Sequence, residues 1–82
     1  MKILFVKSAE SELLSLNRIL GQRLIKKITL LKNNPFGQNS KKLSGRSGYR
    51  IRIGDYRIVY VIDKKKQIIT IIKIGHRRDI YK

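Results

Sequence analysis

The sequence has no cysteine, few acidic residues and no long apolar segment. Without cysteine, the chain can form neither a disulfide framework nor a thiolate metal site, which suits a reducing compartment. Its apolar runs are far shorter than the roughly 20 residues that a membrane-spanning helix needs. The opening residues MKILFV are too few to form the apolar region of a signal peptide. We therefore expect a cytoplasmic protein without a membrane partner.

Acidic residues are scarce: 5 Asp and Glu stand against 20 Lys and Arg, which gives a formal net charge of +15 in 82 residues. No acid lies between Glu12 and Asp55. Such an excess of one sign repels itself unless the partner is a polyanion, so the charge favours a nucleic-acid partner. A chain of this length has room for one core, and we expect a single domain over residues 1–82.

The first half of the chain predicts a strand followed by two helices. Residues 1–6 are apolar enough for a strand, and Ser8 is the expected N-cap of a helix whose first turn carries acids. From there, apolar residues recur at the helical spacings of three and four: Leu13, Leu16, Leu20, Leu24, Ile28 and Leu31. Gly21 is the expected break between the helices, and NNPFG at 33–37 ends the helical pattern.

The second half predicts a sheet. A polar, basic loop leads to GYRIRIGDYRIVYVI at 48–62, two alternating runs joined by Gly54 and Asp55, and such a two-residue connection is a strong hairpin signal. Residues 63–66 form a second turn, and the β-branched run at 67–74 favours a central strand. The expected fold is α+β, with two helices packed on an antiparallel sheet in the order β-α-α-β-β-β.

The hairpin register places three arginines on one face of the sheet. If Ile53 lies opposite Tyr56, then Arg52 lies opposite Arg57, and Arg50 follows on the same face. The opposite face should be core and carries Tyr49, Ile51, Ile53, Tyr56 and Tyr60. Facing like charges cost some tenths of a kcal/mol, roughly, per pair. The arginines form either the solvated face of a one-sided sheet or a site for a polyanion.

These elements, together with GDYRIVY at 54–60 and GHRRDIY at 75–81, resemble the RelE/ParE superfamily of bacterial and archaeal toxins. The resemblance spans nearly the whole chain and is closer to RelE-type mRNA endonucleases than to ParE-type gyrase poisons. It implies a toxin of a type II toxin–antitoxin system that cleaves messenger RNA in the ribosomal A site, by attack of the RNA's own 2′-hydroxyl on the phosphodiester. It also implies an antitoxin protein as the inhibiting partner.

The resemblance assigns roles to individual residues. Arg57 matches the arginine that stabilises the charge building on the phosphate, and Arg77 matches a further basic catalytic residue. Tyr81 matches a terminal aromatic that is associated with the nucleotide and with proton transfer. Contacts to RNA are expected from Lys41, Lys42, Arg46, Arg50, Arg52 and Arg78. Such a mechanism needs no cofactor or metal, and the sequence has no cluster of metal ligands.

The proton carrier stays open between His76 and Tyr81. Several RelE-type enzymes have lysines at the positions of Arg50 and Arg52, and arginine does not give up its proton in proteins, so neither can be a general base. His76 is the only histidine, a residue type that titrates near neutral pH, and it adjoins Arg77 at the expected mouth of the site.

Two other functions remain: a gyrase poison, which needs neither proton carrier, and a passive nucleic-acid-binding module, for which the charge suffices.

Overall fold

The computed structural model describes residues 2–33, 40–42 and 48–76. These residues form, in order, β1 (Lys2–Phe5), α1 (Lys7–Ser15), α2 (Arg18–Leu30), β2 (Ser40–Lys42), β3 (Tyr49–Ile53), β4 (Tyr56–Asp63) and β5 (Ile68–His76). The predicted α+β class is confirmed, and so is the predicted order of the elements: one strand, two helices and then the hairpin strands. The short strand β2 lies in the stretch that was expected to be a loop.

The strands form one sheet in the order β1-β5-β4-β3-β2. Three of the four pairings are antiparallel, but β1 runs parallel to β5, so the sheet is mixed rather than purely antiparallel. β5 pairs with β4 along one edge and with β1 along its other edge. The isoleucine-rich β5 is therefore a central strand, as its β-branched composition predicted.

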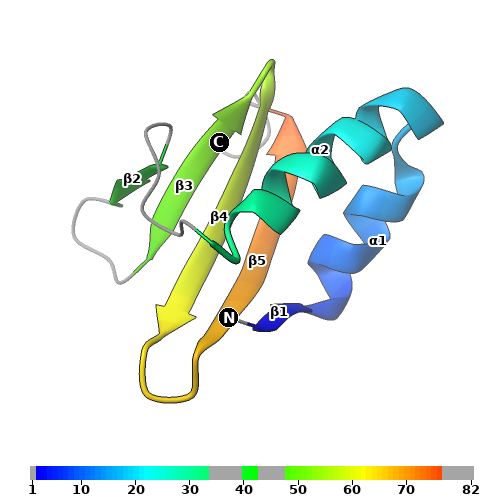
Figure 1. Cartoon of the computed structure of the whole chain (residues 1–82). Helices are drawn as coiled ribbons and strands as arrows, with labels where there is room; N and C mark the ends of the chain where they lie inside the picture. Colours follow the sequence, from blue (N-terminus) through cyan, green and yellow to red (C-terminus); the bar gives the residue numbers. More distant parts are fainter. Residues whose placement is uncertain (1, 34–39, 43–47, 77–82) are drawn as a thin grey trace.

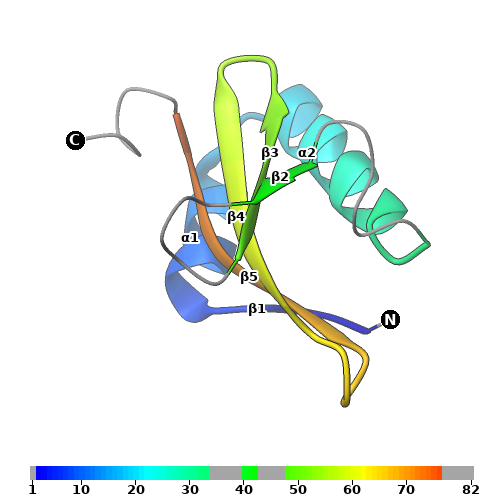
Figure 2. The same cartoon turned by 90° about the vertical axis from the view of Figure 1, so that its left-hand side faces the viewer.

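Both helices lie on the same face of the sheet (Figures 1 and 2). Alternate residues of β3, β4 and β5 point toward the helices, because strand side chains alternate between the two faces. Together with the apolar face of α2 they form the core, which includes Leu24, Ile28, Leu31, Ile51, Ile53, Ile58, Tyr60, Ile69, Ile71 and Ile74. Tyr60 is fully buried and stacks on Tyr49, with ring centroids 5.8 Å apart. The helical period and the inward-facing tyrosines are thus confirmed.

The first helix starts earlier than predicted. α1 begins at Lys7, its N-cap residue is Val6, and no side chain caps it, so Ser8 lies inside the helix instead of at its cap. The Val6 N–H donates to the carbonyl of Ile71 at 3.0 Å, which continues the pairing between β1 and β5 up to the helix. The backbone position of α1 is therefore fixed by the sheet rather than by a serine cap.

The break between the helices lies at Asn17, not at Gly21. The Asn17 side chain accepts a hydrogen bond from the backbone N–H of Leu20 at 2.9 Å and caps α2. Such a cap satisfies one of the backbone donors that a helix leaves without a partner at its start. Gly21 is a buried residue within α2.

The hairpin register agrees with the prediction. Ile53 pairs with Tyr56, and Arg52 pairs with Arg57. Gly54 has a φ of 61°, and Asp55 is not among the positive-φ residues of the described chain, which is the pattern of a type II′ turn with glycine at its first central position.

A β-bulge interrupts the pairing of β4 with β5. Val59 pairs with Lys73 and Tyr60 pairs with Ile71, so Ile72 is an extra residue on β5. Strict alternation after Ile71 would direct Lys73 into the core. The extra residue resets the alternation, leaves Lys73 exposed and places Ile74 in the core.

The Asn17 cap can be tested by substitution. Because the cap satisfies a backbone donor, we expect Asn17→Ala to lower the free energy of unfolding by about 1 kcal/mol. For a domain of this size, that loss lowers the melting temperature by about 4–8 °C. Ser8→Ala is the matched control and should melt close to the wild type in thermal denaturation followed by circular dichroism. An equal loss for Ser8→Ala, with Asn17→Ala unchanged, would contradict the assigned cap.

Candidate functional site

The sheet surface opposite the helices carries three arginines: Arg50, Arg52 and Arg57. We call this cluster the arginine face. β3 buries Ile51 and Ile53 beneath the helices, so its alternate residues Arg50 and Arg52 point the other way. The same alternation in β4 directs Arg57 away from the core. The structure therefore brings together the three arginines that the sequence placed on one face.

Arg52 and Arg57 are held directly opposite each other. They pair across β3 and β4, which sets their Cβ atoms about 4.5–5.5 Å apart. The Arg52 Nε donates to the carbonyl of Gly54 at 3.2 Å and so holds this exposed side chain near the turn. Arg57 is half-buried, and its Nη1 atom is shielded from solvent. A cation in such a position interacts more strongly with a bound anion than an exposed one does, since water screens it less.

The position across from Arg57 on β5 is Gly75. Glycine has no side chain, so β5 adds no bulk beside the guanidinium of Arg57 on this face. Arg50 pairs with Val59 on β4 and with Lys41 on β2. The backbone register thus brings one predicted RNA-binding lysine next to Arg50, whereas Lys42 pairs with Tyr49.

The one acid within strands β3 and β4, Asp63, lies away from the middle of the arginine face. Asp63 is at the far end of β4, six residues beyond Arg57, which corresponds to about 20 Å of extended strand. That separation exceeds the Debye length of about 8 Å at physiological ionic strength. Asp63 also has a local role, since its Oδ1 accepts from the backbone N–H of Lys66 at 3.1 Å. It therefore does not offset the positive potential around Arg57.

His76 does not join the arginines. It pairs with Tyr56 across β4 and β5, on the face that is directed toward the helices, and the two rings meet edge to face with centroids 5.6 Å apart. The bulge at Ile72 is the physical reason, because uninterrupted alternation along β5 would have placed His76 on the arginine face. The expected position of His76 at the mouth of the site is therefore corrected, although its role in catalysis stays a prediction.

Four predicted site residues fall outside the described ranges: Arg46, Arg77, Arg78 and Tyr81. Within the ranges that the structure describes, no group of three or more His, Cys, Asp or Glu side chains could hold a metal ion. In that same part of the chain, no helix has the length and apolarity needed to cross a bilayer.

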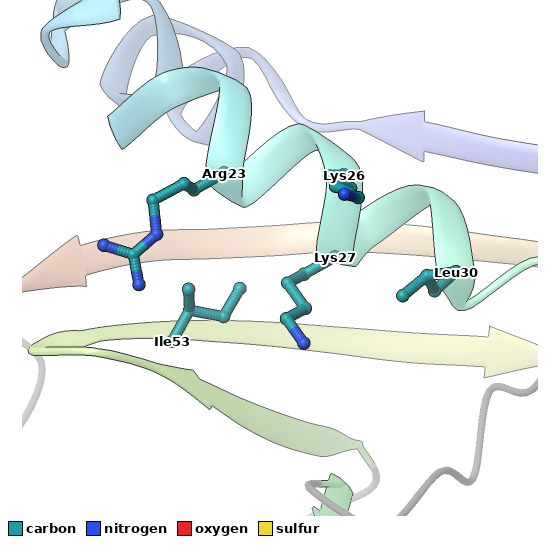
Figure 3. Close-up of a pocket in the computed structure, with 5 residues that line it drawn as sticks. All are labelled: Arg23, Lys26, Lys27, Leu30 and Ile53. Carbon is teal, nitrogen blue, oxygen red and sulfur yellow. The ribbon is translucent and has the colours of Figure 1, made fainter. Parts of the chain in front are cut away.

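Sequence reasoning missed a second basic feature, a groove between α2 and β3. It is lined by Arg23, Lys26, Lys27, Leu30 and Ile53 (Figure 3). The sequence alone could not show that basic residues of α2 border a groove with Ile53 at its floor. The only available signal was the spacing of Arg23 and Lys27, which places both on one side of a helix.

Comparison with known proteins identifies relatives of the whole chain. The family model described as "ParE toxin of type II toxin-antitoxin system, parDE" matches residues 3–81. Comparison with curated protein sequences gave no match.

Solved structures of RelE toxins have the same fold. The isolated RelE toxin of E. coli has 26% identity and a TM-score of 0.82, with 98% of this chain and 89% of that chain covered. The toxin in the intact E. coli RelBE toxin–antitoxin complex has 26% identity and a TM-score of 0.81, with 92% and 94% covered. A chain of the RelB–RelE antitoxin–toxin complex of Methanococcus jannaschii has 27% identity and a TM-score of 0.76, with 95% and 94% covered.

The fold, the arginine face and a family match over almost the full length agree with one another. The chain belongs to the RelE/ParE superfamily as a RelE-like toxin of a type II toxin–antitoxin system.

Proposed function

We propose that the chain is a ribosome-dependent mRNA endonuclease whose arginine face binds the phosphate that is cleaved. The observation that carries this proposal is the direct pairing of Arg52 with Arg57, next to Arg50, on the sheet face opposite the helices. Facing like charges destabilise a sheet. A bound phosphodiester removes that repulsion, and its charge is greatest in the transition state, so the same arrangement favours catalysis.

The proposed reaction needs only the RNA and side chains of this protein. The 2′-oxygen of one ribose attacks the adjacent phosphorus and forms a new P–O bond, while the bond from phosphorus to the 5′-oxygen of the next nucleotide breaks. The 2′-hydroxyl proton passes to a base, and the departing 5′-oxygen takes up a proton. The products are a 2′,3′-cyclic phosphate and a 5′-hydroxyl. Arg57 stabilises the extra negative charge on the non-bridging oxygens.

Of the two candidate proton carriers, we propose Tyr81 rather than His76. The side chain of His76 packs against Tyr56 on the helix side of the sheet, whereas the phosphate is proposed to bind on the other side. A proton carrier must come within hydrogen-bond reach of the group that it serves. The resemblance of GHRRDIY to RelE-type toxins supports Tyr81, which lies outside the described residues.

One observation favours a second function. The matching family model is that of ParE toxins, and ParE-type members of the superfamily act as poisons of DNA gyrase. On that alternative, the arginine face would contact protein or DNA and no proton carrier would be required.

We likewise propose that the physiological partner is a cognate antitoxin, because relatives with 26% and 27% identity were crystallised with RelB antitoxins.

Arg57 provides the most direct test of the site. We expect Arg57→Ala to slow cleavage of ribosome-bound message by about 10²–10³, because one positioned charge donor is lost. Cleavage is measured by primer extension on purified ribosomes. Lys65→Ala is the matched control, since it removes one exposed charge at the tip of the β4–β5 hairpin and should cleave at the wild-type rate. Undiminished cleavage by a folded Arg57→Ala protein would exclude the proposed site.

The choice of proton carrier gives a paired prediction. Loss of a general acid or base typically lowers the rate by about 10²–10⁴. We expect a loss in this range for Tyr81→Phe and less than about tenfold for His76→Gln, measured as single-turnover rates. Melting curves of His76→Gln would verify that loss of the ring contact with Tyr56 leaves the fold intact. The opposite order of the two rates would assign proton transfer to His76.

The charge of the chain predicts salt-dependent docking. Each phosphate contact to single-stranded RNA contributes about −0.7 to the slope of log affinity against log salt concentration. The arginine face should therefore contribute a slope of about −2, and Arg50→Gln should make the slope shallower by about 0.7. Fluorescence titration of labelled toxin with ribosomes at increasing salt concentration would measure both slopes. A flat dependence for the wild type would show that the basic surface does not contact phosphate.

A further inference from the structure

Gly75 stands in an isoleucine-rich strand that contains no other glycine. β-Branched side chains suit a strand, whereas a glycine inside one weakens it. The residue lies in the extended backbone of β5 and is not among the positive-φ glycines of the described chain, so the backbone here does not require glycine. The reason for a glycine at this position therefore lies in the space that a side chain would occupy.

That space is on the arginine face. Gly75 pairs with Arg57, whose side chain points away from the helices. Gly75 is nevertheless buried, and Arg57 is half-buried, with its Nη1 atom shielded from solvent. A strand residue on the face opposite the helices loses its contact with solvent only where other side chains lie over it, and Arg57 is the residue directly across β4.

The charge on β3 favours a position of the Arg57 side chain over β5. Arg52 lies opposite Arg57 on β3, and the Cβ atoms of such a pair are only about 4.5–5.5 Å apart, so the two cations repel each other. The hydrogen bond from the Arg52 Nε to the Gly54 carbonyl, 3.2 Å long, holds Arg52 near the turn. Of the two residues that flank Arg57 across β3 and β5, only Gly75 has no side chain.

We propose that Gly75 is the seat of Arg57 and a positioning residue of the cleavage site. Because residue 75 has no Cβ, the Arg57 side chain lies low across β5, away from Arg52, and its guanidinium faces the phosphate from a fixed direction. Gly75 itself touches neither the RNA nor the reacting atoms. This inference rests on the proposed nuclease function and adds a residue to that site.

The β-bulge at Ile72 places the glycine at this position. Val59 pairs with Lys73 and Tyr60 with Ile71, so the register of β5 shifts by one residue. Uninterrupted pairing from Tyr60 and Ile71 would set Ile74 against Arg57, and its branched side chain would fill the seat. Bulges are frequent next to active sites, where they change the direction of a side chain. Here the bulge exchanges an isoleucine for a glycine beside Arg57.

Enlarging residue 75 tests the seat. We expect Gly75→Val to slow single-turnover cleavage of ribosome-bound message by about 10²-fold, because a misplacement of about 1 Å can cost that factor. Affinity for ribosomes should stay at the wild-type value, since no cation is removed. Wild-type cleavage by a folded Gly75→Val protein would overturn the proposal. If melting curves show that this variant does not fold, Gly75→Ala is used, for which we expect a loss of at least about threefold.

Thr70→Val is the matched control. It places a valine on the same face of β5, across from Val61, which lies four residues beyond Arg57 on β4. We expect this variant to cleave at the wild-type rate, because its side chain does not reach the seat. An equal loss for Thr70→Val and Gly75→Val would assign the effect to the strand rather than to Arg57 and would overturn the proposal.

A double-mutant cycle separates positioning of Arg57 from obstruction of the RNA. If Gly75 acts only through Arg57, Gly75→Val should have no further effect in an Arg57→Ala background, because the guanidinium that it displaces is gone. If residue 75 contacts the RNA, the two losses should multiply, which would overturn the proposal. Single-turnover rates of the wild type, the two single variants and the double variant provide the cycle.

A structural readout does not depend on cleavage. In isotope-labelled protein, the nuclear magnetic resonance signal of the Arg57 Nε–H group is identified by its absence from Arg57→Ala. We expect Gly75→Ala to shift this signal and Thr70→Val to leave it in place. An unmoved signal in Gly75→Ala would overturn the seat even if the wild type cleaves RNA. A shifted signal with no cleavage by the wild type would support the seat and contradict the proposed nuclease function.

Discussion

The burial of one face of the sheet against α2 is the constraint on which the rest of the molecule depends. Strand side chains alternate, so burying Ile51, Ile53 and Ile58 directs Arg50, Arg52 and Arg57 to the opposite side. Full burial of an isoleucine contributes about 1.5–3 kcal/mol, whereas a facing pair of like charges costs only some tenths of a kcal/mol, roughly. Core formation therefore sets the register, and the fold can keep the arginines together in the absence of a ligand.

The same constraint separates three basic surfaces. The arginine face, the basic residues of α2 and the lysines of the β4–β5 turn lie on different parts of the molecule, and a net charge of +15 is thus distributed by topology rather than concentrated in one site. The bulge at Ile72 belongs to this arrangement. Because of this extra residue, Ile74 rather than Lys73 points into the core, His76 points toward the helices, and Gly75 lies opposite Arg57. A cleaved phosphate on the arginine face would therefore be surrounded by guanidinium groups rather than by the imidazole.

Much of the fold could be predicted from the sequence because it rests on local patterns. The Gly54 turn fixed the hairpin register, and the spacing of Leu24, Ile28 and Leu31 fixed the buried side of α2. The parallel pairing of β1, the short β2 and the bulge could not be predicted, since each depends on contacts between distant segments. The Asn17 cap had a signal in the sequence, an asparagine ahead of an apolar helical pattern, but the prediction placed the break at Gly21 and did not consider Asn17. For the site, the arginine cluster followed from register alone, whereas the position of His76 depended on the bulge.

The central claim is that the arginine face catalyses cleavage of RNA at a ribosome-bound phosphodiester. The most direct measurement is the chemistry of the message ends after incubation of the purified chain with translating ribosomes. Attack by the 2′-hydroxyl predicts upstream fragments that end in a 2′,3′-cyclic phosphate and downstream fragments that begin with a 5′-hydroxyl, with uncut message when ribosomes are omitted. Intact message on ribosomes, together with accumulated gyrase–DNA breaks in cells that produce the chain, would contradict the account.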